Sequence, residues 1–206
     1  MTKERVIAAF DFDGTLTVRD SFVELAKHVR GRCGLLVACV WTAPWMIAWK
    51  LRLCRGGVAK QRLFGQLYRG MSAGRFREYC DSFAALLVRM ENPDVVERLR
   101  WHQTQGHAVY IVSASMPEWI APWAALHGID RDHILGTEME VDGRGCITGR
   151  FATPNCSGAE KVRRLQGAEG PLDDVTLYAY GDSSGDQDLL AIADYPTYVG
   201  KKRCIK

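Results

Sequence analysis

The stretch Val6-Ile7-Ala8-Ala9-Phe10-Asp11-Phe12-Asp13-Gly14-Thr15 decides the fold of this 206-residue chain. Five apolar residues followed by two aspartates and a glycine predict a buried β-strand that ends in a polar loop. In open α/β sheets, ligands bind outside the carboxyl ends of the strands. Because side chains two apart in extended chain point the same way, Asp11 and Asp13 would face one ligand while Phe12 turns into the core.

Three interpretations of these aspartates compete. One carboxylate can attack a substrate as a nucleophile while the other moves protons. Asp-Gly is also an ordinary turn signal that needs no chemistry. A calcium loop is the third interpretation, but Thr15 and Phe22 fit its ligand positions poorly, so the sequence argues against it.

A second acidic loop follows the strand-like run over residues 175–180. It reads Gly181-Asp182-Ser183-Ser184-Gly185-Asp186 and precedes a predicted helix over residues 187–193. Asp182 would lie at the strand end, where carboxylates can hold Mg²⁺, and Asp186 just behind it. A polar turn that caps the next helix explains the same residues without a metal.

Two more segments carry candidate phosphate ligands. The predicted strand 107–112 ends at Ser113-Ala114-Ser115, with Pro117 in the first turn of the next helix. The Ser113 hydroxyl can bind phosphate or simply cap that helix. A further helix begins near Gly158 and carries Lys161, either a solvated lysine or the cation that a carboxylate beside a phosphate requires.

In this order, Asp11-Phe12-Asp13-Gly14-Thr15, Ser113, Lys161, Gly181-Asp182 and Asp186 resemble the motifs of the haloacid dehalogenase superfamily. The resemblance covers nearly the whole chain and is greatest for the subfamily that includes phosphoserine phosphatases. It implies an α/β Rossmann-like core with a parallel sheet and an inserted helical cap. It also implies hydrolysis of a phosphomonoester through an aspartyl-phosphate, in two in-line steps.

The same resemblance implies roles for individual residues. Asp11 would be the nucleophile and Asp13 the general acid and base, while Ser113 and Lys161 would bind phosphate. Mg²⁺ would be held by Asp11, by Asp182 and by the backbone carbonyl of Asp13. Asp186 would support the metal site, and Gly14 and Thr15 complete the first motif.

The order of elements predicts how the chain divides. Strand, helix and strand in succession favour a parallel sheet covered on both faces. We expect residues 1–16 and 93–206 to form the catalytic core and residues 17–92 the cap, with hinges near Thr17 and Asn92-Pro93. Helices are predicted over 94–105 and 117–127, and a β-hairpin over 137–141 and 146–151.

The cysteines indicate the compartment. Seven are scattered without a Cys-x-x-Cys pair, which favours a reducing compartment, hence the cytoplasm, and small buried roles for most of them. The apolar run near the start is too short for the core of a signal peptide, so none is predicted.

Charge is concentrated in the expected cap. Residues 17–92 hold thirteen Lys and Arg against five Asp and Glu, a net +8, whereas the remainder of the chain is net −5. Such a cap can steer phosphate esters, lie against anionic lipid, or simply present a solvated face. No nucleic-acid partner is expected, because no binding motif accompanies the charge.

Residues 33–49 are seventeen residues without a charge, bracketed by Arg30, Arg32, Lys50, Arg52 and Arg55. The run is short for a membrane span of about 20 residues, and Pro44 is expected to interrupt it. Val37, Trp41, Trp45 and Trp49 recur every fourth residue and so share a helical face. Residues 33–55 therefore either contact an anionic membrane surface or pack inside the cap.

The substrate is less determined. Phosphoserine phosphatases carry glutamate nine residues after the nucleophile, where this chain has Asp20, and asparagine where it has Gly185. Asp20 is therefore the candidate for binding the rest of the substrate, but as the shorter carboxylate it would reach a substrate amine less readily. The Trp-rich basic cap favours a lipid or amphiphilic ester, and the substrate predicted is a small or amphiphilic alcohol phosphate. Phosphoserine, histidinol phosphate and phosphatidylglycerophosphate-like lipids remain alternatives, as do transfer to another alcohol and a scaffold without catalysis.

Overall fold

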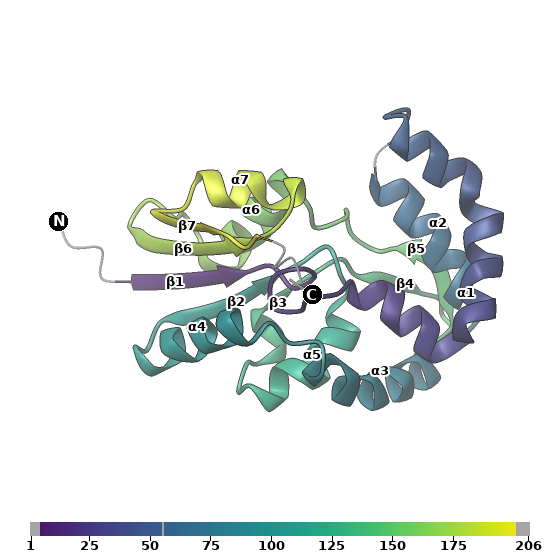
Figure 1. Cartoon of the computed structure of the whole chain (residues 1–206), viewed down its shortest axis with the longest axis horizontal. Helices are drawn as coiled ribbons and strands as arrows, with labels where there is room; N and C mark the ends of the chain where they lie inside the picture. The colour runs from purple at the N-terminus through teal and green to yellow at the C-terminus, as the bar shows by residue number, and fades with distance from the viewer. Residues whose placement is uncertain (1–4, 55, 201–206) are drawn as a thin grey trace, which may run out of the picture.

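A five-stranded parallel sheet forms the centre of the molecule (Figure 1). The computed structural model describes residues 5–54 and 56–200. The strands lie in the order β3-β2-β1-β6-β7. Their bounds are β1 Arg5–Phe10, β2 Ala108–Val112, β3 Ile134–Leu135, β6 Val175–Gly181 and β7 Tyr195–Tyr198. The α/β class and parallel sheet predicted from the sequence are thus confirmed.

The central strand β1 is apolar throughout because both of its faces are covered. It pairs in parallel with β2 on one side and β6 on the other. Ala8 and Phe10 belong to one hydrophobic cluster, and Ile7 and Ala9 to another. This two-sided burial explains an unbroken apolar run in place of alternation.

Helices cover the two faces of the sheet. On one face lie α4 (Pro93–Thr104) and α5 (Pro117–Leu126), and on the other α6 (Ala159–Glu169) and α7 (Gln187–Ala191) (Figure 1). Short 3₁₀ turns span Arg131–His133 and Ser184–Asp186. Leu99 and Trp119 join the first cluster, Leu165 and Leu189 the second. The strand and helix predictions agree with these elements within a few residues.

Three helices, here called the inserted helices, lie between β1 and α4 in the chain. They are α1 (Ser21–Lys50), α2 (Gly56–Tyr68) and α3 (Ala73–Val88). α1 and α2 form one end of the molecule, beyond the sheet (Figure 1). The predicted hairpin is present as β4 (Met139–Val141) and β5 (Ile147–Phe151), and the Phe151 ring lies 5.7 Å from that of Phe64 on α2.

The two connections to the inserted helices run side by side. The Val18 N–H donates to the Met90 carbonyl and the Asn92 N–H to the Leu16 carbonyl, each at 2.8 Å. Thr17 also forms an antiparallel bridge with Glu91. The chain therefore leaves and re-enters the sheet region through one narrow, hydrogen-bonded connection.

The long helix α1 bends at a glycine. Gly31 has φ +69°, which interrupts the helical geometry between two segments. The prediction that Pro44 interrupts this segment is wrong, because the helix continues to Lys50. Pro44 and Val40 are exposed, so water can solvate the carbonyl that loses its N–H partner, and the helix continues through the proline.

The cysteines depart from expectation. Of the six in the described ranges, Cys80 and Cys156 are buried, Cys33 is exposed and the others are intermediate. The prediction that most are buried is therefore wrong, because Cys33, Cys39 and Cys54 lie on or just after the apolar part of α1, of which only 11% is buried. Those six are all free thiols, while Cys204 and Arg55 lie outside the described residues.

Candidate active site

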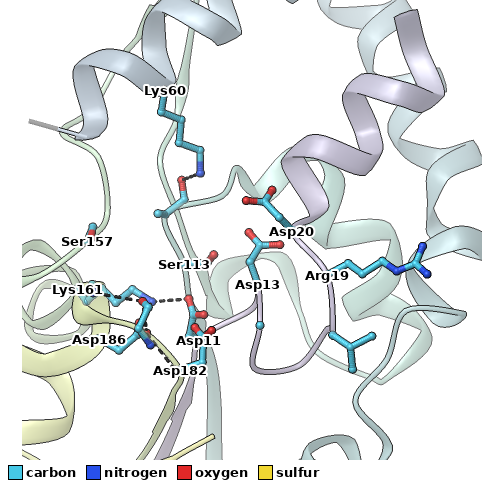
Figure 2. Close-up of a pocket in the computed structure, with 15 residues that line it drawn as sticks. Asp11, Asp13, Arg19, Asp20, Lys60, Ser113, Ser157, Lys161, Asp182 and Asp186 are labelled. Carbon is cyan, nitrogen blue, oxygen red and sulfur yellow. Dashed lines mark hydrogen bonds and ion pairs between the residues drawn. The ribbon is translucent and has the colours of Figure 1, made fainter. Parts of the chain in front are cut away.

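Loops from distant parts of the chain meet at the carboxyl edge of the sheet around a cavity of about 360 Å³ (Figure 2). They follow β1, β2 and β6, and the start of α6 completes the wall. Most of the predicted site residues line this cavity: Asp11, Asp13, Gly14, Asp20, Ser113, Lys161, Asp182 and Asp186. Thr15 lies behind Asp11.

Asp11 is a buried carboxylate fixed from several sides. Its N–H donates to the Tyr180 carbonyl of β6 at 2.9 Å, which continues the strand pairing. Its Oδ1 lies 2.5 Å from Lys161 Nζ, and Thr15 Oγ1 lies 3.4 Å from its Oδ2. Burial raises the pKa of Asp11 to about 7 although Lys161 opposes the rise.

Lys161 is a buried cation with only 2% of its surface exposed. Its Nζ donates to Asp11 Oδ1 at 2.5 Å and to the Val112 carbonyl at 2.6 Å, and it lies 2.6 Å from Asp186 Oδ1. Burial alone would lower the pKa of Lys161, but the two carboxylates raise it above its ordinary value. An ammonium has three N–H donors, and Asp11, Val112 and Asp186 are near enough to take all three. Lys161 therefore acts on a ligand in the pocket through its positive charge.

Asp13 is held at both carboxylate oxygens. The Ser21 N–H at the start of α1 donates to Oδ1 at 2.6 Å, and the Ser115 hydroxyl donates to Oδ2 at 2.5 Å. Phe12 is fully buried and packs edge-on against Trp123, as the alternation predicts. Asp13 therefore has a fixed orientation at the pocket wall.

The loop after β2 contributes two serines. Ser113 is buried at the pocket wall, and its Oγ accepts a hydrogen bond from the Ser115 N–H at 3.1 Å. Ser113 was predicted from the sequence as a site residue, whereas Ser115 was not. The Ser-x-Ser spacing is a signal that both hydroxyls face one side, but nothing in the sequence shows that Asp13 lies within reach.

Asp186 organises the loop that carries Asp182. Its Oδ2 accepts the N–H groups of Asp182 and Ser183 at 3.2 and 2.9 Å and the Ser183 hydroxyl at 2.7 Å. With Ser183 it completes a capping box, so the helix-cap interpretation holds for Asp186. Asp182 itself lies against Gly14, because a Cβ on Gly14 would come within 2.3 Å of Asp182 Oδ2.

The acidic residues fit a divalent cation. Asp11, Asp182 and Asp186 each offer an oxygen, and the three oxygens lie within 4.8 Å of one another. Three carboxylates around the single ammonium of Lys161 leave an excess of negative charge. Asp186 Oδ2 accepts the loop N–H groups and Oδ1 lies 2.6 Å from Lys161 Nζ, so Asp11 and Asp182 are the better candidate ligands.

The rim of the cavity is formed in part by the inserted helices. Asp20 is exposed at the rim, where its Oδ1 accepts the Val23 N–H and caps α1. Lys60 of α2 reaches down and donates to the Ala114 carbonyl at 3.0 Å (Figure 2). Lys60, Arg19 and Ser157 line the cavity, and sequence reasoning missed them.

Comparison with known proteins identifies relatives along most of the chain. The family model described as haloacid dehalogenase-like hydrolase matches residues 8–191. Protein CicA of Caulobacter vibrioides, recorded from two strains, is 37% identical over 203 residues, which cover 96% of this chain and 87% of CicA.

Solved structures share the fold. A protein of unknown function from Bordetella pertussis Tohama I superposes with a TM-score of 0.79 at 25% identity, covering 94% of this chain and 89% of that one. A phosphoserine phosphohydrolase-like protein from Francisella tularensis gives 0.62 at 16% identity, with 94% of both chains covered. A substrate-bound phosphoserine phosphatase gives 0.62 at 15% identity, covering 92% and 83%. The motifs, the fold and the family model agree, and the chain belongs to the haloacid dehalogenase-like hydrolase family.

Proposed function

We propose that the protein is a Mg²⁺-dependent phosphatase that hydrolyses a phosphomonoester through an aspartyl-phosphate on Asp11. The observation that carries the proposal is the buried Asp11–Lys161 ion pair at the wall of a cavity shared with Asp13 and Ser113. A carboxylate in such a site can form a covalent intermediate, and the second acid can move protons.

Asp11 begins the reaction by attacking phosphorus in line with the ester oxygen. As the Asp11–phosphorus bond forms, the phosphorus–ester bond breaks and Asp13 gives its proton to the departing alcohol. The hydrogen bonds from Ser21 and Ser115 hold the Asp13 carboxyl in place for this transfer. The Ser113 hydroxyl and the charge of Lys161 stabilise the phosphoryl oxygens.

Water completes the cycle. Asp13 takes a proton from the water molecule that attacks phosphorus, and the Asp11–phosphorus bond breaks to release phosphate. Mg²⁺, held by Asp11, Asp182 and the Asp13 carbonyl, would neutralise charge on the phosphoryl oxygens. Asp186 and Gly14 act indirectly in this proposal, since they position Asp182.

The inserted helices, within residues 17–92, act as a cap in this proposal, and the remaining chain as the catalytic core. Two contacts support that division. The paired connections at Leu16–Val18 and Met90–Asn92 provide one narrow hinge. Lys60 extends from α2 to the loop after β2, so the cap reaches the cavity directly. Closure would exclude bulk water during the first step.

The rim favours a substrate with polar and apolar parts. Asp20, Arg19 and Lys60 place charges of both signs at the entrance, while Val18 adds an apolar surface. We therefore infer a small or amphiphilic alcohol phosphate. A lipid phosphomonoester is the second candidate, favoured by the exposed apolar side chains of α1. The site of action would be the cytoplasm or the membrane surface.

Asp11→Asn tests the reaction. The variant should remain folded and lose at least about a thousandfold in release of phosphate from p-nitrophenyl phosphate, because an amide cannot attack phosphorus. The wild-type protein should lose activity when Mg²⁺ is chelated and regain it when the ion returns. Asp81→Asn on exposed α3 is the control and should retain activity. Equal turnover by wild type and Asp11→Asn would contradict the proposal.

A further inference from the structure

The outer side of α1 is apolar and exposed. Five large side chains on this surface, here called the docking face, each expose between 55% and 68% of their area: Leu36, Val37, Val40, Trp41 and Ile47. They lie within the seventeen residues that carry no charge. Soluble monomers rarely expose contiguous apolar patches of this kind, so we expect the docking face to contact another protein or a membrane. The alternative that Val37 and the tryptophans pack in the cap core is wrong for Val37 and Trp41, which are more than half exposed, whereas Trp49 lies beside Gly56 of α2.

The opposite side of the same helix packs against protein. Ala38 and Thr42 are buried there, and at the start of α1 Phe22, Leu25 and Ala26 belong to the main hydrophobic cluster. α1 is long and apolar enough to cross a membrane, although core helices of other proteins and signal sequences have the same length and composition. Only 11% of its most apolar 18-residue segment is buried. A helix fixed along one side presents only its free side, a geometry that suits lying flat in an interface.

A basic cavity adjoins the docking face. It has a volume of about 500 Å³ and lies between α1, α2 and β5. Its lining includes Arg62, Arg69 and Arg150, here called the arginine pocket, together with Trp41 and Trp45. Among the described residues that line this cavity, none is acidic.

Close backbone packing brings the arginines together. Gly65 of α2 and Gly149 of β5 approach so closely that a Cβ on Gly149 would lie 2.8 Å from Gly65 Cα. Arg69 donates to the Thr148 carbonyl at 3.0 Å, and the Arg62 guanidinium lies over the Trp45 ring at 5.2 Å. The cavity is therefore a preformed concentration of positive charge beside an apolar surface.

We propose that the docking face and the arginine pocket bind the protein to an anionic phospholipid membrane, with a phosphate-bearing lipid headgroup in the pocket. Guanidinium groups bind phosphate, and tryptophans beside cations are favoured at membrane interfaces. A second copy of the chain fits less well, because a two-fold interface would bring the same arginines face to face. The proposal does not depend on phosphatase activity.

Vesicle flotation with the full chain tests the proposal. We expect binding to phosphatidylcholine vesicles that contain about 30% phosphatidylglycerol, at about 100 mM salt, to exceed binding to pure phosphatidylcholine by about tenfold or more. Asp11→Asn should float like wild type, so the outcome is independent of the proposed reaction. Inorganic phosphate and glycerol phosphate, titrated without vesicles, distinguish a soluble anion from a lipid headgroup.

Matched variants separate the apolar and basic contributions. Leu36→Ser and Leu126→Ser remove side chains of nearly equal exposure, 65% and 66%, but Leu126 lies on α5. We expect Leu36→Ser with Val40→Ser, neither of which lines the arginine pocket, to reduce vesicle binding about tenfold, and Leu126→Ser to leave it unchanged. Replacing Arg62, Arg69 and Arg150 by Gln should remove the preference for anionic vesicles. The control variant has Gln at the exposed Arg89, Arg98 and Arg100, loses the same charge and should keep that preference.

Several outcomes would overturn the proposal. One is that the wild-type protein does not bind anionic vesicles at low salt. Another is that the variant with Gln at Arg62, Arg69 and Arg150 binds anionic vesicles as well as the variant with Gln at Arg89, Arg98 and Arg100. Phosphate binding to the pocket without any vesicle binding would assign it to a soluble anion. If the wild-type protein is a dimer and Leu36→Ser with Val40→Ser dissociates it, the docking face belongs to an interface with a second copy.

Discussion

At the scale of single residues, Gly14 shows how backbone geometry can set a candidate metal ligand. Its φ of +83° favours glycine, and Asp182 occupies the space where a side chain would begin. Gly70 has nearly the same φ, +81°, but an added Cβ there would meet nothing within 4 Å. Substituting alanine at both glycines therefore distinguishes two effects: backbone strain, which both variants have, and displacement of Asp182, which only the Gly14 variant has.

We expect Gly14→Ala to reduce kcat/KM for a phosphomonoester by about a hundredfold and to raise the Mg²⁺ concentration needed for activity, because small displacements in a site are costly. Gly70→Ala should lose about 1–2 kcal/mol of unfolding free energy and keep its activity. Steady-state kinetics across Mg²⁺ concentrations and urea unfolding measure both effects. Equal loss of activity in the two variants would show that strain alone is responsible.

Ser115 tests the role of Asp13. Without the hydroxyl that donates to Asp13 Oδ2 at 2.5 Å, the carboxyl loses one of its two fixed contacts. A hydrogen bond to a charged group contributes about 1.5–3 kcal/mol, so kcat for Ser115→Ala should fall about tenfold to a hundredfold. The loss should be larger for an alkyl phosphate than for p-nitrophenyl phosphate, whose leaving group needs little protonation. An equal loss on both substrates would remove Asp13 positioning as the explanation.

Sequence order identified the aspartates, Ser113 and Lys161 because each follows or precedes a strongly patterned element. Ser115 and Lys60 escaped because their importance depends on distances across the fold: Ser115 meets Asp13 from 102 positions away, and Lys60 reaches Ala114 from 54. Asp20 shows the reverse case, a residue chosen by spacing that the structure explains first as a helix cap.

At the scale of elements, the Lys161 cluster joins α6 to the loops after β1, β2 and β6. Removing the cation would leave the buried Asp11 and Asp186 without their partner. We expect Lys161→Met to reduce the unfolding free energy by about 3–5 kcal/mol, measured by urea denaturation. Lys27 also pairs with a carboxylate, Glu24 at 2.7 Å, but its side chain is 37% exposed, so Lys27→Met should cost less than about 1 kcal/mol.

A second substitution checks that explanation. Asp186→Asn in the Lys161→Met background removes one of the stranded charges, so part of the lost unfolding free energy should return. Additive losses in the double variant would indicate that the two residues stabilise the fold separately.

Element prediction succeeded where burial is simple. β1, β2 and β6 are nearly continuous apolar runs with polar ends, and each was found within about two residues of its bounds. β3 has two residues and β7 is exposed and contains Pro196, so neither gives a clear pattern. α1 was misjudged at Pro44 because the sequence does not show which side of the helix is solvent.

At the scale of the whole molecule, the order of strands and the exposure of the inserted helices lay beyond the sequence. Parallel pairing follows from alternating strands and helices, but the position of β1 between β2 and β6 depends on how the crossovers pack. Likewise, spacing placed Val37, Trp41, Trp45 and Trp49 on one face but left open whether that face is covered. In the structure Val37 and Trp41 are more than half exposed, Trp49 lies beside Gly56 of α2, and Trp45 borders the arginine pocket.

The change of global stability with pH should depend on His102, a buried histidine whose ring contacts that of the half-buried His107. His102 is fully buried, with Nδ1 2.8 Å from His107 Nδ1 and Nε2 2.9 Å from the Tyr180 hydroxyl. Burial, followed by the charges of His107 and Arg98, lowers the pKa of His102 to about 4. The unfolded chain takes up a proton near pH 6.5, whereas the folded protein keeps this ring neutral until about pH 4.

Stability contributed by the neutral His102 is therefore complete above pH 6.5 and is lost as the pH falls toward 4. The total loss from this group should be roughly 1–3 kcal/mol, at a slope of up to about 1.4 kcal/mol per pH unit. Urea unfolding of wild type and His102→Gln between pH 7.5 and 4.5 isolates the contribution, because the carboxylates are common to both proteins. The variant should be less stable at neutral pH, since Tyr180 and His107 lose a partner, yet its stability should fall less steeply on acidification. Parallel curves for the two proteins would show that the folded state already accepts the proton at His102.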